Sequence, residues 1–488
     1  MSRTRIALLV LILCCWSTMA KALLVDPVDP GFRHELQLVA DAGLIPGALS
    51  TWPVSRLALH DALRDIDDAT LDEAAPGVRE AARRVMERLD VRPGGFGGVS
   101  AQAVAGEGRP PARLAWYGLQ DPSGSEASAE VGWRNDRVSV RGRVRAVEHA
   151  VDDDDLRYDG SRAAVRAGNW ILAAGAQPVW WGPGWSGSPI KGTASRPVPA
   201  VHAVRSSPKA FEHPWLDWIG PWTLHAFYGQ LESDRHISNA DYGGMRVVFR
   251  PYPWLEFGLS RTFIWAGEKN ARNQRNFRDL WFGRSNDRDR DVSADQLAGW
   301  DLRLSFGEGQ RNALYGHFIG EDEAGMLPAN YFGMLGLERV SDGGNARWFA
   351  EFADTSTRFY ESRRTFNQAY EHSQFRTGNR HRGRPLGFPT DNDTRSVSLG
   401  MMRFGNEGRQ DHVVARLAQL NRNDANRSGD GGNRISERAT DLVDIEYLHR
   451  REAGPGYWEL GVGGAWLDEA GSGSQFEPRV MAGWQGEW

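Results

Sequence analysis

The residues of this sequence that are most suited to binding chemistry are aromatic. One stretch, residues 168–232, contains seven tryptophans interleaved with glycine and proline, and its densest part is WWGPGW at 180–185. A soluble core rarely combines these residue types, because glycine and proline interrupt the repeats that bury aromatic rings. Flat indole faces suit two other settings, a stacking platform for sugar rings and the interfacial layer of a membrane.

We predict a polysaccharide-binding surface built from these aromatic residues and from arginines near them. Indole faces supply stacking, and guanidinium groups bind carboxylates through two parallel hydrogen bonds. The candidate residues are Trp180, Trp181, Trp185, Arg196, Trp218, Trp222, Arg141 and Arg143. For the tryptophans the alternative is an interface girdle or packing at strand ends. For the two arginines before the aromatic stretch the alternative is charge pairing with nearby glutamates.

No sequence motif indicates catalysis or a metal site. Neither GxSxG nor HExxH occurs. In a chain with this many acids, two carboxylates at glycosidase spacing would arise by chance. The acidic runs at 152–155, 320–323 and 391–393 do not have EF-hand spacing, and we expect solvated loops there. We therefore predict no enzyme activity, no cofactor and no metal.

Composition excludes further classes of protein. The formal net charge is -5 over 488 residues, which does not indicate a nucleic-acid partner. After residue 22, no stretch of the sequence offers the roughly 20 apolar residues of a membrane-spanning helix. The mean hydropathy of -0.51 is typical of soluble proteins. Membrane barrels share this property, because every second residue of their strands faces a polar lumen.

Residues 1–22 have the pattern of a secretory signal peptide. Arg3 and Arg5 precede an apolar run, and an A-x-A cleavage site occupies 20–22. Both cysteines, Cys14 and Cys15, lie in this segment, so the mature chain is expected to contain no disulfide. We predict that the mature protein begins at Leu23.

The next segment, residues 23–95, has apolar residues at helical spacing and predicts a small bundle of helices over 32–42, 54–66 and 71–89. From residue 96 to 488 the apolar period changes to two, which predicts β-strands. A hairpin about Asn135-Asp136 is expected to place Glu130 opposite Arg141 and Glu126 opposite Arg145. One face of this hairpin is apolar and the other charged, as in a barrel wall. The last strand, 480–488, alternates up to a C-terminal tryptophan.

Connection lengths also alternate in the second half of the chain, which is typical of outer-membrane barrels with short periplasmic turns and long external loops. Short connections are expected near 251–253, 307–310, 341–345, 405–409 and 451–456. Long ones are expected near 266–297, 320–329, 355–394, 421–438 and 468–477. For residues 180–221 the pattern leaves three placements open, an outer loop, a pair of strands or a segment folded into the lumen.

Several segments resemble the Wzi-type capsule-assembly outer-membrane protein family. They are WWGPGWSGS, SRPVP and WLDWIGPW, with GQLE at 229–232, LEFGLSRTFIWAGE at 255–268, LAGWDLR at 297–303, YGHFIGEDEAGMLP at 315–328 and DNDTRSVSLG at 391–400. Residues 189–197 depart from the family pattern, in which an asparagine precedes Ala-Arg-Pro. The resemblance implies an all-β transmembrane barrel of about 18 antiparallel strands, with the α-helical bundle on the periplasmic side as a plug.

The resemblance also implies a function. It implies a lectin-like protein of the outer membrane that binds capsular or extracellular polysaccharide and supports its attachment and organisation at the cell surface. The expected partners are this polysaccharide, outer-membrane lipids and the polysaccharide export machinery, and the expected state is a monomer. The alternatives are a channel for oligosaccharide uptake and an outer-membrane glycan hydrolase.

Overall fold

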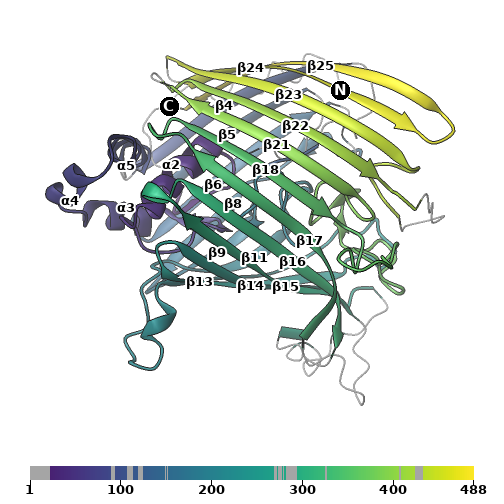
Figure 1. Ribbon diagram of the computed structural model, residues 1–488, viewed down its shortest axis with the longest axis horizontal. Helices are drawn as coiled ribbons and strands as arrows, with labels where there is room; N and C mark the ends of the chain where they lie inside the picture. Colours follow the sequence, from purple (N-terminus) through teal and green to yellow (C-terminus); the bar gives the residue numbers. More distant parts are fainter. Residues whose placement is uncertain are drawn as a thin grey trace.

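The computed structural model is a closed antiparallel β-barrel with helices at one end (Figure 1). The structure describes residues 22–89, 94–106, 114–118, 125–148, 150, 152–268, 272, 277, 280–281, 294–324, 327–405, 408–423, 432–454 and 456–487. The proposed signal peptide lies outside these residues except for Ala22, and so does the C-terminal tryptophan.

Within the described residues, the barrel wall is formed by 19 strand segments in 18 positions, because β7 and β8 both pair with β6 and share one position. The predicted barrel of about 18 strands is confirmed. Its segments are β4 (Gly94–Gly106), β5 (Glu126–Arg134), β6 (Val138–Val147), β7 (Leu156–Arg157), β8 (Arg162–Ala167), β9 (Trp170–Ala176), β11 (Pro199–Arg205), β12 (Trp222–Gln230), β13 (Asp241–Tyr252), β14 (Leu255–Trp265), β15 (Ala294–Phe306), β16 (Asn312–Ala324), β17 (Leu327–Val340), β18 (Ala346–Asp354), β21 (Arg395–Phe404), β22 (Gln410–Leu420), β23 (Thr440–Ala453), β24 (Gly456–Glu469) and β25 (Gly473–Glu487). Strand β25 pairs with β4 and closes the barrel.

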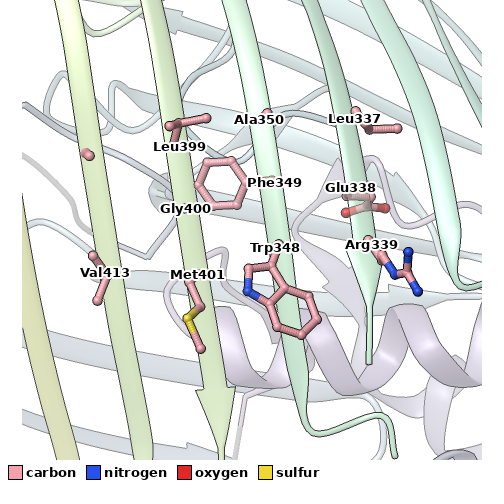
Figure 2. Close-up of a pocket in the computed structure, with 11 residues that line it drawn as sticks. Leu337, Glu338, Arg339, Trp348, Phe349, Ala350, Leu399, Gly400, Met401 and Val413 are labelled. Carbon is pink, nitrogen blue, oxygen red and sulfur yellow. The ribbon is translucent and has the colours of Figure 1, made fainter. Parts of the chain in front are cut away.

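Side chains alternate between the two faces of this wall, as the period of two predicts. The outward positions carry exposed apolar residues, among them Val131, Leu172, Leu259, Leu335, Leu399, Val443, Val462 and Val480. The inward positions carry buried polar residues, among them Ser128, His202, Arg246, Asp301, Arg347, Arg416 and Asp444. Figure 2 shows a shallow hollow on the outward face, bordered by Leu337, Trp348, Leu399, Met401 and Val413. An outward surface this apolar suits contact with lipid.

The first predicted hairpin forms with a register that differs from the predicted one. Glu130 lies opposite Arg143, and Arg141 lies opposite Gly132, because the turn centres one residue later than predicted. A shift of this kind moves partners by two positions and keeps every side chain on its face. The predicted ion pairs still form, along the diagonal: Arg141 binds Glu130, and Arg145 binds Glu126.

The helical region contains α2 (Pro30–Asp41), α3 (Arg56–Arg64), α4 (Asp68–Glu73) and α5 (Pro76–Leu89). The predicted helix over 71–89 is wrong as a single element. Proline clashes with the preceding turn of a helix and restricts the residue before it, so Pro76 begins α5 and separates it from α4. Asp29, Ser55 and Asp67 cap the starts of α2, α3 and α4 by accepting backbone hydrogen bonds.

Helix α2 lies in the mouth of the barrel, and all its residues are buried. Its Asp41 accepts two hydrogen bonds from Arg303 of β15, each at 2.8 Å. On another strand, β18, Arg347 donates to His34 Nδ1 over 3.0 Å. Arg250 of β13 donates to the carbonyl of Ala40 over 2.6 Å. Contacts with strands this far apart around the wall place the helix across the opening.

The barrel therefore has two different ends. At the helix end, the connections are mostly short, as between β13 and β14 or between β17 and β18. At the opposite end, which we call the loop end, strands are joined by longer connections such as 231–240 and 355–394. The long connections predicted near 320–329 and 468–477 are wrong, because β16, β17, β24 and β25 extend through most of those residues. No described helix combines the length and apolarity needed to cross a membrane.

Residues 177–221 combine the placements that the sequence left open. Residues 177–198 fold back from the loop end into the lumen and are almost entirely buried. Strand β11 then forms part of the wall, between β9 and β12. Residues 206–221 form an exposed connection at the helix end, with the short 3-10 helix η2 (Asp217–Ile219).

An arginine placed on the outward face tests its contact with lipid. Val462→Arg in β24, at an outward position between Tyr447 and Val480, should lower the free energy of unfolding in a bilayer by about 2–4 kcal/mol. The measurement is urea unfolding in liposomes, followed by heat-modifiable migration. Ser472→Arg, in the exposed connection after β24, is the control and should behave like the parent. Equal stability of the two variants would contradict a lipid-facing wall.

Candidate functional site

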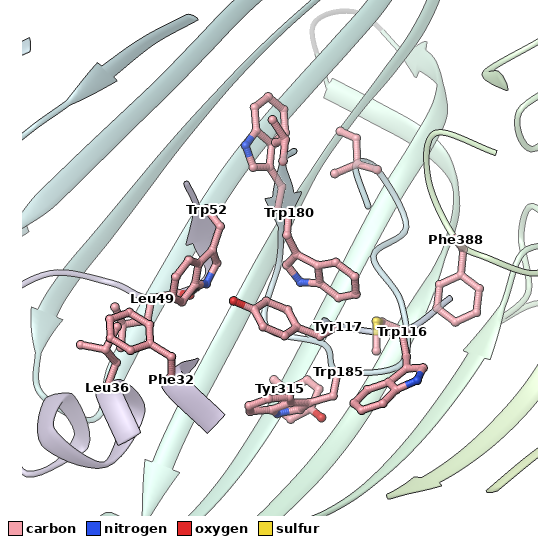
Figure 3. Packing of buried hydrophobic residues seen from close by; sticks show 14 of the residues in the cluster. Phe32, Leu36, Leu49, Trp52, Trp116, Tyr117, Trp180, Trp185, Tyr315 and Phe388 are labelled. Carbon is pink, nitrogen blue, oxygen red and sulfur yellow. Dashed lines mark hydrogen bonds between the residues drawn. The ribbon is translucent and has the colours of Figure 1, made fainter. Parts of the chain in front are cut away.

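The tryptophan-rich motif lies inside the lumen and packs against the helical region. Strand β10 (Trp180–Trp181) pairs with β2 (Thr51–Trp52), so that Trp180 lies opposite Trp52. Tyr117 contacts Trp52, Trp180 and Trp185 through edge-to-face arrangements, with ring centroids 5.2–5.8 Å apart. Figure 3 shows these rings meeting side chains of the helical region. Edge-to-face packing of this kind is favourable for aromatic rings, and it joins the lumen segment to the helical region.

The indole of Trp185 is buried, with 1 % of the residue exposed. Its Nε1 donates a hydrogen bond to Glu338 over 2.9 Å. The guanidinium of Arg33 lies 4.0 Å from the ring centre, and Phe349 stacks on the ring at 6.3 Å. Arg33 also donates to the carbonyls of Pro183 and Gly184. An indole this buried presents no face to a sugar ring.

Trp181 is equally enclosed. Its side chain is 0 % exposed, and its Nε1 donates to His225 Nδ1 over 3.0 Å. Gly182 follows with a positive φ of 124°, and a Cβ there would lie 2.5 Å from His317 Nδ1. The glycine is therefore required for the close approach of this backbone to the barrel wall. The motif WWGPGW, a candidate stacking platform for sugar rings, presents no exposed indole and packs inside the lumen.

Arg196 is already occupied by carboxylates of its own chain. Its guanidinium binds Asp152 and Asp154 at 2.7 Å and Asp159 at 3.0 Å. Burial opposes the charged form of Arg196, but the hydrogen bonds to Asp159 and Asp154 outweigh it and raise the pKa of the guanidinium. The expectation of a fully solvated acidic run at 152–155 is wrong for Asp152, whose side chain is buried between Arg196 and Arg157.

Arg141 and Arg143 face the lumen near the same wall. Arg141 donates to Asp26 over 2.8 Å and also binds Glu130. Arg143 donates to Ser128 over 3.3 Å. Asp26 belongs to the segment that precedes α2, so the pairing of Arg141 holds this segment against the barrel.

The last two candidates, Trp218 and Trp222, lie at the helix end. Trp218 is 72 % exposed beside Trp215, which is 81 % exposed. Trp222 is covered by Arg205, whose guanidinium lies 3.8 Å from the ring centre, and it stacks on Phe211. The eight candidates therefore do not form one site: they divide among the lumen core, the wall beside Asp26 and the helix end.

A different group of residues at the loop end has the properties of an anion-binding surface. Asp354, at the end of β18, is fully buried and is shared by three arginines. Arg422 binds it at 2.6 Å, Arg395 at 3.3 Å and Arg364 at 4.0 Å. The side chains of Arg364 and Arg395 are 36 % and 33 % exposed. One carboxylate among three guanidinium groups leaves positive charge at the surface.

The connection 355–394, which carries Arg364 of this cluster, is held by internal ion pairs. Arg380 in β19 (Arg380–His381) binds Asp391 and Glu371, each at 2.7 Å. Asp393 accepts hydrogen bonds from the backbone N–H of Asn367, at 2.9 and 3.0 Å. The expectation that 391–393 is a solvated loop is wrong, because all three residues are buried. A fixed connection keeps Arg364 in place beside Arg395 of β21, which lowers the entropic cost of binding a ligand.

The arginine cluster could not be found from the sequence. Arg364, Arg395 and Arg422 are spread over three connections or strand ends, and no spacing relates them to Asp354. Aromatic faces accompany them: Phe366 lies 5.4 Å from the guanidinium of Arg422, and Tyr360 is exposed. Among the described residues, no group of three His, Cys, Asp or Glu residues is arranged to hold a metal ion.

Comparisons with known proteins identify relatives of this chain. The family model described as capsule assembly protein Wzi matches residues 111–453. An uncharacterized 55.8 kDa protein in the cps region of Klebsiella pneumoniae is 29 % identical over 337 residues, which are 67 % of this chain and 65 % of that protein. The chain thus spans just under two thirds of that relative.

A solved structure has the same fold. It is that of Wzi from Escherichia coli, described as an outer membrane protein involved in group 1 capsule assembly and as a carbohydrate-binding β-barrel. The TM-score is 0.81 with 24 % sequence identity, and the match covers 95 % of this chain and 99 % of that one.

Removal of a lumen indole tests its packing role. Trp185→Ala should lower the free energy of unfolding by about 3–5 kcal/mol, because it leaves a cavity and removes the hydrogen bond to Glu338. Denaturant unfolding measures the loss. Trp215→Ala removes an exposed indole and is the matched control, with little expected change. Equal stability of the two variants would show that Trp185 does not hold the lumen together.

The carboxyl of Asp393 makes stability depend on pH. Burial raises the pKa of this group from 3.8 to about 7. Between these values the folded state holds a proton that the unfolded state has released, so this group lowers stability as pH rises from about 4 to about 7. Asp393→Asn should remove that part of the slope in unfolding measured across this range. The same slope in the variant and the parent would mean that Asp393 ionises normally.

Proposed function

Because the chain belongs to the capsule assembly protein Wzi family, we propose that it is an outer-membrane protein that binds an acidic polysaccharide at the loop end and supports capsule assembly. Carbohydrate binding is described for Escherichia coli Wzi, whose structure shares this fold. The Klebsiella pneumoniae relative is described as a protein in a cps region, which supports a role in capsule assembly.

In this proposal the helix end faces the periplasm and the loop end faces outwards. Outer-membrane barrels have short periplasmic turns and long external connections, which matches the two ends here. The apolar outward face contacts outer-membrane lipid, and the protein acts as a monomer. The exposed Trp215 and Trp218 lie in the interfacial layer of the periplasmic leaflet, where tryptophan is favoured. They are therefore assigned to lipid and not to polysaccharide.

The single observation that carries the binding proposal is the sharing of Asp354 by three arginines. Guanidinium groups bind carboxylates with two hydrogen bonds, so the partly exposed Arg364 and Arg395 suit the acid groups of sugars such as uronates. The exposed ring of Tyr360 offers a stacking face in the same connection. Trp181 and Trp185 act indirectly, by holding the lumen segment beneath the loop end.

Binding without cleavage or transport is the function that this arrangement favours. The barrel mouth at the helix end holds α2, and the lumen holds residues 177–198, which disfavours an open channel for oligosaccharide. Two of the buried carboxylates at the loop end, Asp354 and Asp391, are engaged by arginines. A third, Asp393, accepts hydrogen bonds from the backbone N–H of Asn367. A glycan hydrolase needs two carboxyl groups free to face the scissile bond.

The arginine cluster can be tested by changing two of its members. Arg364→Gln combined with Arg395→Gln should weaken binding of purified acidic polysaccharide by at least tenfold, since each charge-assisted hydrogen bond contributes about 1.5–3 kcal/mol before competing losses. Arg311→Gln combined with Arg409→Gln makes the same change of charge at the helix end and should leave binding unchanged. Binding of the acidic polysaccharide to the purified protein is measured and compared with binding of the carboxyl-reduced polymer.

Two results would contradict the proposal. One is equal binding by the folded loop-end variant and the parent. The other is equal binding of the acidic polymer and its carboxyl-reduced form. Capsule released into the culture medium gives a second measurement, which should increase for the loop-end variant alone.

A further inference from the structure

Three side chains in the lumen form a chain of hydrogen bonds whose direction is fixed by chemistry. The indole N–H of Trp181 is a donor only, and it lies 3.0 Å from His225 Nδ1. His225 Nδ1 must therefore accept, so the proton of the neutral ring lies on Nε2. That nitrogen is 3.1 Å from His202 Nδ1 and donates to it. By the same rule, the neutral ring of His202 carries its proton on Nε2.

The end of this hydrogen-bond chain has no acceptor. His202 is 4 % exposed, and its Nε2 has no hydrogen-bond partner among the described residues. A buried donor without an acceptor is costly and rare in native proteins. The donor therefore indicates that an acceptor from outside the protein belongs beside it.

Lys191 brings an ammonium group to the same region. Its backbone carbonyl accepts a hydrogen bond from the backbone N–H of Trp181 over 3.0 Å, which places the backbone of Lys191 beside that of Trp181. Its side chain is 4 % exposed, and no carboxylate of the described residues forms an ion pair with it. The charge of Lys191 interacts electrostatically with the side chains of His202, His225 and His381. Burial alone lowers the pKa of Lys191 to about 7.

The other polar groups of the region do not supply an acceptor for Lys191. Glu232 is bound by His381, and Asp159 by Arg196. Asp26 is bound by Arg141 and Arg162. The hydroxyl groups of Thr193 and Ser195, in the same segment as Lys191, are buried without hydrogen-bond partners among the described residues. The region thus combines a cation with donors, and its carboxylates are already paired.

We propose that Lys191 and the Nε2–H of His202 form a buried binding site for an anion of the carboxylate class. Lys191 supplies the charge and His202 a directed hydrogen bond, with Thr193 and Ser195 as further donors. The carboxylate comes either from an acidic sugar of a polysaccharide or from a free small acid. This site is separate from the arginine cluster at the surface and does not depend on it.

The connection 355–394 covers this region. The N–H of Gly192 donates to the carbonyl of Leu386 over 2.9 Å, and the hydroxyl of Tyr370 donates to the carbonyl of Pro189 over 2.5 Å. An anion bound beside Lys191 is therefore enclosed beneath this connection. Enclosure strengthens its attraction to the ammonium group, since the effective dielectric constant is lower there than in water.

The sequence makes a direct test practical, because it contains only four lysines, at positions 21, 191, 209 and 269. Full-length protein in detergent is labelled biosynthetically with lysine carrying carbon-13 at Cε. The Lys191 resonance is identified by its absence from Lys191→Met. It is then titrated with sodium acetate, sodium glucuronate and glucose at constant pH and ionic strength. The first two should shift it in a saturable manner, and glucose should not.

Matched variants separate binding from folding. Lys209→Met removes an exposed lysine at the helix end and should leave the titration unchanged. His202→Phe should weaken the effect of glucuronate on the Lys191 resonance by about tenfold, the loss expected for a hydrogen bond to a charged group. Heat-modifiable migration shows whether each variant is folded.

The outcomes distinguish the sources of the anion. A shift with acetate and glucuronate but not with acidic polysaccharide assigns the site to a free small acid. A shift with the polysaccharide as well, also when Arg364 and Arg395 are changed to Gln, assigns it to an acidic sugar. If neither acetate, glucuronate nor acidic polysaccharide shifts the Lys191 resonance, or if glucose shifts it equally, the proposal is overturned whatever the surface arginines bind.

Discussion

An arginine that points into the lumen cannot lose its proton, so it must find an acceptor there. Much of this structure follows from that requirement. Glu338 accepts from Arg303, Arg347 and Trp185. Arg246 donates hydrogen bonds to Asp301 and to the hydroxyls of Ser50 and Thr51.

Several of these acceptors belong to the helical region and not to the wall. Asp41, the last residue of α2, forms an ion pair with Arg303. Asp26 forms ion pairs with Arg141 and Arg162. Removal of one partner would leave a buried charge unpaired, which costs several kcal/mol. The barrel and its helices are therefore held together by the charges that the barrel could not satisfy alone.

The elements that depend on local pattern could be predicted from the sequence. Strand alternation, the charged face of the first hairpin and the helix predicted over 32–42 follow from the period of the apolar residues, and the structure has them, with α2 beginning two residues earlier, at Pro30. The register of that hairpin depends on which residue centres its turn, which Asn135-Asp136 does not decide. The burial of Trp181 and Trp185 depends on side chains far away in the chain, such as Arg33, His225 and Glu338. Local composition carries no information about such partners, and the same limit applies to the arginines around Asp354.

The pairing of β2 with β10 has a consequence for the order of assembly. Trp52 is synthesised well before Trp180, and the seam between β25 and β4 joins strands from near opposite ends of the described chain. Contacts of such high sequence separation form late in folding, because long loops must close first. Helix α2 and the lumen segment occupy the space inside the wall, so they must already be there when the seam closes. Pairing of β25 with β4 is thus the last step of folding, after α2 and the lumen segment have taken their places inside the wall.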